Sequence, residues 1–459
     1  MTSPRVWRVA FGATLVLSAL VLAVGYVGGA GYETVGNASV ERAMATGADD
    51  QVVGPRENVT VVTTDSNVVV GDEGDGPRAR AEIVAFAPDG RILYYNDSHT
   101  RYWDVDPVPG ERLTVEFVAA DHLSPDACSG ETVCTRNVVE RVNLSTGETT
   151  RLYDRVTPGK HSTRWHDFDR VDEDSIAVAD IHQDRVFVVN TTSELIEWSW
   201  EAETDYARPS GGPYPDDWTH VNDVEVLPDG RLMASLRNQD QVVFLDRETG
   251  LEASWTLGTD DDYDTLYEQH NPDFLPAESG RPSVLVADSE NRRVVEYVRT
   301  GDDWDRTWEW RDSRLQWPRD ADRLPNGNTL VTDSNGDRVL EVDRDGEVVW
   351  SVDVGFPYEA ERLGSGPESA GGPNASAAGL QSRTDGEAAD GLSALASARD
   401  LLPAKLVNAV TYVLPGWVGG LEILALVAFV LTALAWPVVE YRRADFGIDL
   451  QRPFRVRRD

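Results

Sequence analysis

Polar side chains recur at a fixed distance before a short turn in four places along the chain. Counted back five residues from each turn, the equivalent residues are His166, Asn222, His270 and Arg319. His220 stands two residues before Asn222, so on a strand both side chains point to the same side. If these segments meet in space, three imidazoles, an amide and a guanidinium share one pocket.

Such a pocket would suit an anion such as a sulfate or phosphate ester. A histidine in it could act as nucleophile or as general acid or base, while the other imidazoles and the arginine stabilise charge on transferred oxygens. A three-histidine metal site is the competing interpretation. The spacing of His220 and Asn222 and the presence of Arg319 argue against a metal cage, so we expect no metal and no cofactor. We assign Asn271, which follows His270, to substrate binding with Asn222 and Arg319.

The segments belong to a repeating unit that is typical of a β-propeller. Each repeat has a small or acidic residue, a polar turn and an alternating apolar strand. A closing strand often ends in tryptophan, and the tryptophans that do so are Trp200, Trp255, Trp310 and Trp350. Their spacing matches four-stranded blades, which repeat at roughly 40–50 residues. Two earlier strand pairs, at 81–95 and 138–153, bring the number of blades to six, and a strand within 58–70 is expected to close the ring. The first strand of each blade lines the central channel, which explains why equivalent residues would converge.

Two apolar segments lie on either side of the repeats. Val9–Tyr32 carries no charge, and Trp417–Val439 is followed by several arginines. Each is long enough to span a bilayer, which takes about 20 residues. The positive-inside rule then places both termini in the cytoplasm and the propeller outside the cell membrane. A cleaved signal peptide is the alternative for the first segment.

The predicted fold class is therefore all-β, a six-bladed β-propeller flanked by N-terminal and C-terminal transmembrane helices. The expected segments are an anchor at 1–32, a tether at 33–57, the propeller at 58–360, a Gly/Ser/Ala-rich linker with a short helix at 361–414, a second helix at 415–440 and a basic tail at 441–459.

Composition restricts the possible partners. Asp and Glu outnumber Lys and Arg by 79 to 42, giving a formal charge of -37, which indicates a solvated, salt-adapted surface. Nucleic acid is excluded as a partner, because phosphate binding needs concentrated basic residues. Cys128 and Cys134 lack the companions of a zinc site. They are expected to form a local disulfide if they lie outside the cell, and a reduced pair is the alternative.

The other histidines serve as a comparison for the three that are in register. His99, His122, His161 and His182 fall in predicted turns or linkers, where we expect solvated side chains.

The run HVNDVEVLPDGRLMASLRNQDQVVFLDRETGLEASWTLG (220–258), followed by QHNPDFL (269–275), resembles the aryl-sulfate sulfotransferase family. These are exported six-bladed propellers that do not use the nucleotide sulfate donor. The acidic, doubly anchored chain resembles a haloarchaeal-type, membrane-anchored member. The resemblance covers roughly 80–360.

The resemblance implies a catalytic set of His270, His220, Arg237 and His166. A histidine that is sulfated transiently falls on His270, and the His-x-Asn pair falls on His220 and Asn222. Arg237 is assigned from the resemblance alone. The implied reaction moves a sulfuryl group from an aryl sulfate to a phenol. A non-catalytic propeller that binds an anion or glycan, and a metal-dependent propeller hydrolase, are the alternatives.

Overall fold

The structure is a computed structural model, and it describes residues 4–29, 51–65, 81–128, 133–159, 163–276, 281–312, 315–366, 368, 370–384, 403–413, 418 and 420–443. The chain divides into two compact units, Tyr32–Pro415 and the two terminal segments Met1–Gly31 and Gly416–Asp459. Each unit is described by itself. The expected tether and basic tail lie largely outside the described residues.

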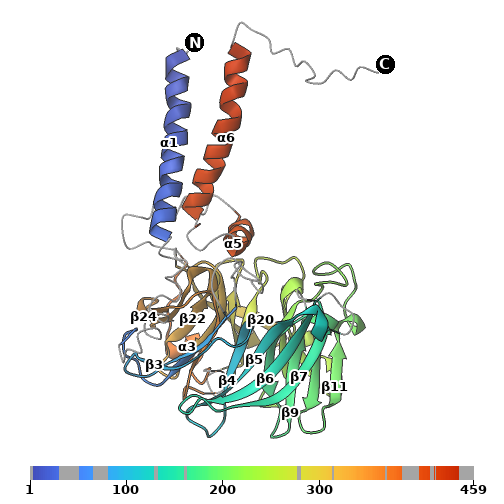
Figure 1. The fold of residues 1–459 in the computed structure, drawn as a ribbon. Helices are drawn as coiled ribbons and strands as arrows, with labels where there is room; N and C mark the ends of the chain where they lie inside the picture. Colours follow the sequence, from blue (N-terminus) through green and yellow to red (C-terminus); the bar gives the residue numbers. More distant parts are fainter. Residues whose placement is uncertain are drawn as a thin grey trace. The chain divides into compact units, whose positions relative to one another are not determined.

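The larger unit is a six-bladed β-propeller, as the repeats predicted (Figure 1). Five blades follow the sequence, each starting with its innermost strand: β4 (Arg101–Pro107), β5 (Thr114–Leu123), β6 (Cys134–Asn143) and β7 (Thr149–Pro158); β8 (Trp165–Arg170), β9 (Ser175–Asp180), β10 (Arg185–Asn190) and β11 (Leu195–Glu201); β12 (Val221–Val226), β13 (Leu232–Leu236), β14 (Gln241–Asp246), β15 (Gly250–Leu251) and β16 (Leu257–Gly258); β17 (His270–Leu275), β18 (Ser283–Asp288), β19 (Arg293–Thr300) and β20 (Asp303–Trp310); β21 (Pro318–Arg323), β22 (Thr329–Asp333), β23 (Arg338–Val342) and β24 (Val348–Asp353).

The sixth blade closes the ring from both ends of the propeller sequence. β25 (Pro357–Arg362) is its innermost strand, followed outwards by β1 (Thr60–Thr64), β2 (Ile83–Phe86) and β3 (Ile92–Asn96). The strand expected within 58–70 therefore closes the ring by pairing with β25. The strand pair at 81–95 belongs to this closing blade, and the pair at 138–153 forms the outer half of the next one. Each innermost strand contacts those of the neighbouring blades, so six strands surround one channel.

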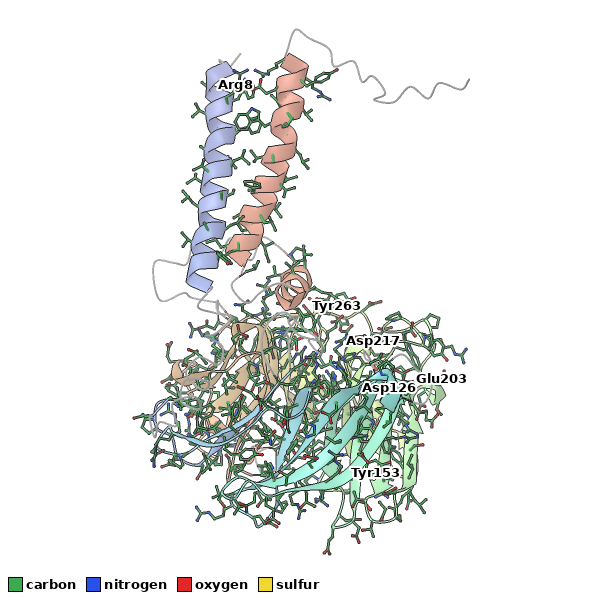
Figure 2. The ribbon with its side chains drawn as sticks, viewed as in Figure 1. Arg8, Asp126, Tyr153, Glu203, Asp217 and Tyr263 are labelled. Carbon is green, nitrogen blue, oxygen red and sulfur yellow. A yellow bond between two sulfur atoms is a disulfide. The ribbon has the colours of Figure 1, made fainter. Side chains whose placement is uncertain are left out.

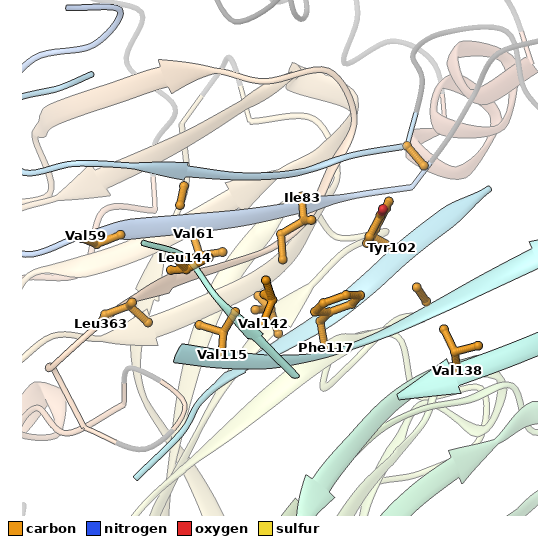
Figure 3. Packing of buried hydrophobic residues seen from close by; sticks show 14 residues of the cluster. Val59, Val61, Ile83, Tyr102, Val115, Phe117, Val138, Val142, Leu144 and Leu363 are labelled. Atoms are coloured by element: carbon orange, nitrogen blue, oxygen red, sulfur yellow. The ribbon is translucent and has the colours of Figure 1, made fainter. Parts of the chain in front are cut away.

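Apolar side chains fill the spaces between the blades. Between the closing blade and the β4–β7 blade, Val61, Ile83 and Phe117 pack with Tyr102 and Leu363 (Figure 3). Alternation along each strand sends these side chains into the inter-blade core. Such burial contributes about 25 cal/mol for each Å² of apolar surface removed from water.

Two of the comparison histidines are not solvated turn residues, so that prediction was wrong for them. His99 lies between Asp121 and Glu140, with Nδ1 3.0 Å and Nε2 3.2 Å from their carboxylate oxygens. His122 lies on β5, where burial and then the charges of Arg164 and Arg101 lower its pKa to about 3. The strand pairing of β5 and β6 brings these groups together over long sequence separations. His182 is half-buried, and His161 lies outside the described residues.

The His99 network predicts that stability falls in alkaline solution. Burial alone would lower the pKa of His99, but hydrogen bonds and charges from Asp121 and Glu140 outweigh it and raise the pKa to about 9. Protonated His99 contributes up to about 3 kcal/mol to the free energy of unfolding. This contribution is complete below the unfolded-state pKa near 6.5 and is lost as the pH rises through about 9. Unfolding by denaturant from pH 6 to 10 measures this. The same slope in His99→Gln would contradict it.

Part of the Gly/Ser/Ala-rich segment is folded onto the propeller. The Ala375 N–H, in α3 (Ala375–Ala378), donates to the Glu296 carboxylate at 2.8–2.9 Å. Trp308 Nε1 donates to the Gln381 carbonyl at 3.1 Å. The Gly/Ser/Ala-rich composition suggested a linker, but residues 370–384 pack on the propeller. Their small side chains leave room for these backbone contacts. Near its end the same segment, 361–414, contains the helix α5 (Ala404–Val413).

The other unit consists of two apolar helices, α1 (Pro4–Gly29) and α6 (Gly420–Arg443). Both are long and apolar enough to cross a membrane. Arg8 forms two hydrogen bonds of 2.7 and 2.8 Å with Glu440 (Arg8 is labelled in Figure 2), and Phe11 stacks on Trp436. The start of one helix therefore lies beside the end of the other, and the helices are antiparallel.

Cys128 and Cys134 are joined by a disulfide bond. It ties the end of the short helix Pro125–Ala127 to the first residue of β6.

Candidate functional site

The site is built from β-bulges at the start of the innermost strands. In most blades the pairing register shifts at one residue near the start, and a bulge re-aims a side chain. We call this position the bulge site; it lies five residues before the turn that follows the innermost strand. The bulge-site residues are Trp103, His166, Asn222, His270, Arg319 and Tyr358. In β17 the pairing is kept at His270 and the shift follows it. All six blades thus direct one such residue toward the axis.

His270 has one ring nitrogen fixed and one open. Nδ1 lies 3.1 Å from the Glu268 carbonyl and 2.8 Å from Ser289 Oγ. Ser289 gives its hydrogen to the Pro318 carbonyl at 2.6 Å, so both neighbours accept and Nδ1 is the donor. The lone pair is therefore on Nε2, for which no described residue is a hydrogen-bond partner.

Burial keeps the His270 ring neutral. The residue is 1% exposed, and burial, followed by the charges of Arg319 and Arg237, lowers its pKa well below the usual value. A neutral imidazole with a free Nε2 lone pair is the reactive form of a nucleophilic histidine.

His220 is held between a carboxylate and a guanidinium. Its Nδ1 lies 2.6 Å from Asp217 Oδ1, and Arg237 Nη1 donates to its Nε2 at 3.2 Å. Arg237 opens the turn Arg237–Gln239 after β13, and its Nη2 lies 3.6 Å from Asp217 Oδ2. Burial and the Arg237 charge lower the pKa of His220. His220 therefore orients Arg237, and the reverse also holds.

His166 joins the same cluster from the preceding blade. Its ring lies 5.2 Å from that of His220 and stacks on Trp103 at 4.8 Å. Nδ1 lies 3.2 Å from the Tyr358 hydroxyl, and the buried Nε2 has no partner in the described part of the chain. Burial, then the charges of His220 and Arg164, hold its pKa well below the usual value.

Two further arginines face the cluster. Arg319 lies over the Tyr358 ring at 4.9 Å and 3.7 Å from Asp65 Oδ2. Arg164 lies over Trp103 at 5.1 Å, and its Nε and Nη1 are buried without a partner in the described chain. Burial lowers the pKa of Arg164. With Arg237, these guanidiniums make the pocket suitable for an anion.

The two asparagines take different places. Asn222 donates Nδ2 to the Gln269 carbonyl at 3.0 Å, and its buried Oδ1 lacks a partner within the described residues. Asn271 instead donates to Glu359 Oε2 at 3.1 Å, one step deeper in the channel, away from the histidines. The sequence grouped it with the substrate pocket because it follows His270.

Carboxylates line the channel beyond the histidines. They occupy the positions one and three residues after the bulge site: Asp104, Asp106, Asp167, Asp169, Asp223, Glu225, Asp273, Asp320, Asp322, Glu359 and Glu361. The groups whose ligand atoms lie within 4.8 Å of one another are carboxylates, and among the described residues the three histidines form no such group. The geometry therefore separates an anion-binding end from an acidic end.

Aromatic side chains surround the open end. Trp317, which lies 6.1 Å from His270, and Phe356 both contact the Tyr412 ring of α5, at 6.0 and 5.6 Å. Asn408 Nδ2, also on α5, donates to Glu290 Oε2 at 2.9 Å. α5 therefore lies beside the histidine end of the channel, and the buried rings of Trp317 and Phe356 pack against its Tyr412.

Several of these residues were not predicted. Arg164 stands two residues before His166, the spacing of His220 and Asn222, and this spacing could have revealed it. Trp103 and Tyr358 stand five residues before Val108 and Leu363, the same count as in the other blades.

Asp217 is predicted to position His220. Asp217 (labelled in Figure 2) accepts the Nδ1 hydrogen, which leaves the Nε2 lone pair for Arg237. Asp217→Asn should lower kcat of any reaction at this site by roughly 10- to 100-fold, the usual cost of losing such a partner. Steady-state kinetics and histidine NMR would measure the rate and the tautomer. Unchanged kcat with a changed tautomer would contradict the prediction.

Comparison with known proteins supports one class of function. The Arylsulfotransferase (ASST) family model matches residues 155–275, a range that contains His166, His220, Asn222, Arg237 and His270. Together with the six-bladed propeller, this match supports an arylsulfotransferase-like protein. Arg319 and Tyr358 lie outside the matched range. No curated protein matches the chain.

Solved structures with similar folds include the periplasmic gluconolactonase PpgL of Pseudomonas aeruginosa, at 15% identity and a TM-score of 0.43, covering 67% of this chain and 99% of the other. A catalytically inactive virginiamycin B lyase of Staphylococcus aureus with quinupristin has 9% identity and a TM-score of 0.38, covering 64% and 85%. A putative 6-phosphogluconolactonase of Bacteroides fragilis has 12% identity and a TM-score of 0.40, covering 66% and 98%.

Proposed function

We propose that the protein is a membrane-anchored arylsulfotransferase that transfers a sulfuryl group through His270. The observation that carries the proposal is the open Nε2 of a neutral, buried histidine in a cluster with three guanidinium groups, of which that of Arg164 has two nitrogens without a partner among the described residues. The family match over 155–275 supports the same class. The aromatic rings of Trp317 and Tyr358 beside His270 support an aryl substrate.

In the first half-reaction, His270 Nε2 attacks the sulfur of an aryl sulfate. The N–S bond forms as the S–O bond to the aryl group breaks, and the phenolate leaves. The ring becomes cationic, and its Nδ1–H remains bonded to the Glu268 carbonyl and Ser289 Oγ. These two acceptors stabilise the positive charge on the ring, while Arg164, Arg237 and Arg319 face the sulfuryl oxygens.

In the second half-reaction, a phenol attacks the sulfur and the N–S bond breaks. Its proton needs an acceptor, and we assign this role to His166, whose Nε2 has no partner among the described residues. His220 Nε2 already accepts from Arg237. The proton passes to solvent or to the first phenolate, so His270 and His166 return to their neutral forms.

The two apolar helices support anchoring of the chain to a bilayer. The propeller is placed on the outer side and both termini in the cytoplasm because arginines follow the second apolar segment. Protease treatment of intact cells and of inverted vesicles tests this orientation. Cleavage of the propeller in intact cells is expected, and protection there would contradict the orientation.

The test of the chemistry is mass analysis of the intact protein after incubation with an aryl sulfate and no acceptor. A sulfuryl adduct should form, map to His270 on peptide analysis and disappear when a phenol is added. An adduct at another residue, or none in protein that releases the donor phenol, would overturn the proposal. An anion that raises the melting temperature without any adduct or turnover would instead favour a non-catalytic binding protein.

A further inference from the structure

Five of the channel carboxylates and Glu368 lie in one continuous cluster. Three groups have oxygens within 4.8 Å of one another: Asp104, Asp106 and Glu368; Asp104, Asp167 and Glu359; and Glu359, Glu361 and Glu368. Shared members join the groups, and we call the six residues the carboxylate cluster. It lies beyond the histidines, on β4, β8, β25 and the segment after β25.

A structural role explains only part of this cluster. Asp104 Oδ2 accepts the Phe168 N–H at 3.2 Å, and Glu359 Oε1 accepts the Val105 N–H at 3.3 Å. These bonds satisfy backbone donors on the channel edge of the innermost strands, which sheet pairing leaves open. They do not involve Asp106 or Glu368.

An unpartnered oxygen beside the cluster points to a missing ligand. Asp106 is 7% exposed, and its side-chain partner among the described residues is another carboxyl group, that of Glu368. Asn271 is 6% exposed; its Nδ2 donates to Glu359, and its Oδ1 is left without a partner in the same part of the chain. A buried acceptor without a partner is destabilising, so a ligand that satisfies it and the carboxylates together is favoured.

Neighbouring basic residues do not neutralise the cluster. Arginines end three of the innermost strands, but they pair elsewhere: Arg170 with Glu116 at 2.6 Å, Arg323 with Glu296 at 3.2 Å and Arg362 with Glu341 at 3.3 Å. Buried charges without such compensation are unfavourable. The cluster is therefore neutralised by protons or by a cation from outside the chain.

We propose that the carboxylate cluster binds a hard divalent cation, Ca²⁺ or Mg²⁺. Its donors are all oxygens, which favour hard cations over zinc or copper. Ligands at 2.3–2.6 Å on opposite sides of Ca²⁺ lie about 5 Å apart, which accommodates the 4.8 Å spread. A cavity of about 1120 Å³, lined by Asp106 and Glu368 among others, gives the ion a path from solvent.

The ion would stabilise the closure of the ring. Its ligands come from β25, which ends the propeller, and from β4 and β8 in the next two blades. One ion thus bridges the strand that completes the circle to its neighbours. This role does not depend on the proposed transferase activity.

The test uses the full-length protein in detergent, freed of metal with a chelator and then dialysed at high NaCl against Ca²⁺ or Mg²⁺. Elemental analysis should find a stoichiometric ion, and the melting temperature should rise with its concentration. Asp106→Asn and Glu368→Gln should weaken the apparent affinity by about tenfold or more. The response to Ca²⁺ compared with Mg²⁺ identifies the preferred ion.

The matched control is Asp260→Asn. Asp240, Asp260 and Asp261 form another group with oxygens within 4.8 Å, but there Asp260 accepts the Gly211 N–H at 3.2 Å. This variant should bind the ion normally. Asp106→Asn removes charge and keeps the side-chain shape, so its metal-free melting temperature should be unchanged or higher. No stoichiometric ion in the wild type, or equal affinity in Asp106→Asn, would overturn the proposal.

Discussion

Replacing His270 with asparagine should abolish sulfuryl transfer, lowering kcat/KM by roughly four orders of magnitude or more. Asparagine can still donate an N–H near the Glu268 carbonyl and Ser289, which now hold Nδ1 at 3.1 and 2.8 Å. It offers no nitrogen lone pair to sulfur. The fold should therefore remain while the chemistry is lost, and donor binding should change little.

Release of phenol from an aryl sulfate, followed in stopped-flow and steady-state experiments at high salt, measures this loss. His182→Asn is the matched control, because His182 lies in the turn Ile181–Gln183 of another blade and its side chain is half-buried. Turnover within a few-fold of the wild type in His270→Asn would show that another residue carries the sulfuryl group.

The fold was predictable because its repeats are regular. Alternating strands recur in the blades, Pro-Asp-Gly or Pro-Asn-Gly turns occur at 88–90, 228–230 and 325–327, and each blade buries its apolar face against the next. Ring closure was predicted only as a strand within 58–70. Its partner β25 has no Pro-Asp-Gly turn after it, and Glu359 and Glu361 interrupt its apolar pattern, so the sequence did not identify it as a strand of the closing blade.

The site was predictable to the extent that it follows the repeat. His166, Asn222, His270 and Arg319 were found by counting from a turn, and the bulges preserve that count. Contacts between blades have no such signal. Ser289 reaches His270 from the turn after β18, and this depends on the path of that turn.

The acidic end of the channel illustrates a different difficulty. Alternating acids such as Asp104 and Asp106 have the pattern of a strand that faces solvent on one side, and the strongly acidic composition makes that interpretation natural. The closed ring turns this face inward, and both residues are buried. Only the three-dimensional arrangement distinguishes a channel from an outer surface.

Replacing Arg164 should have the second large effect, because the replacement should change activity and stability in opposite directions. It is 8% exposed, and two of its nitrogens are buried with no partner among the residues described. A buried guanidinium without a carboxylate is destabilising. Its position beside His166 and Trp103 is explained if it binds the oxygens of the sulfuryl group. Groups placed for binding or catalysis commonly lower the stability of the folded protein.

Arg164→Met keeps most of the side-chain volume and removes the charge. The rate constant kcat should fall by roughly 10²–10³-fold, the cost of losing one donor to a developing oxyanion, while the melting temperature of the free protein stays the same or rises. Added sulfate should raise the melting temperature of the wild type and have a weaker effect on the variant.

Arg208→Met is the control for Arg164→Met, because its side chain is 65% exposed, and it should leave kcat, melting temperature and the sulfate response unchanged. A parallel loss of activity and stability in Arg164→Met would mean that Arg164 supports the structure. A fall in kcat with retained stability assigns it to the sulfuryl group, because only a ligand at this place makes an unpaired buried arginine favourable.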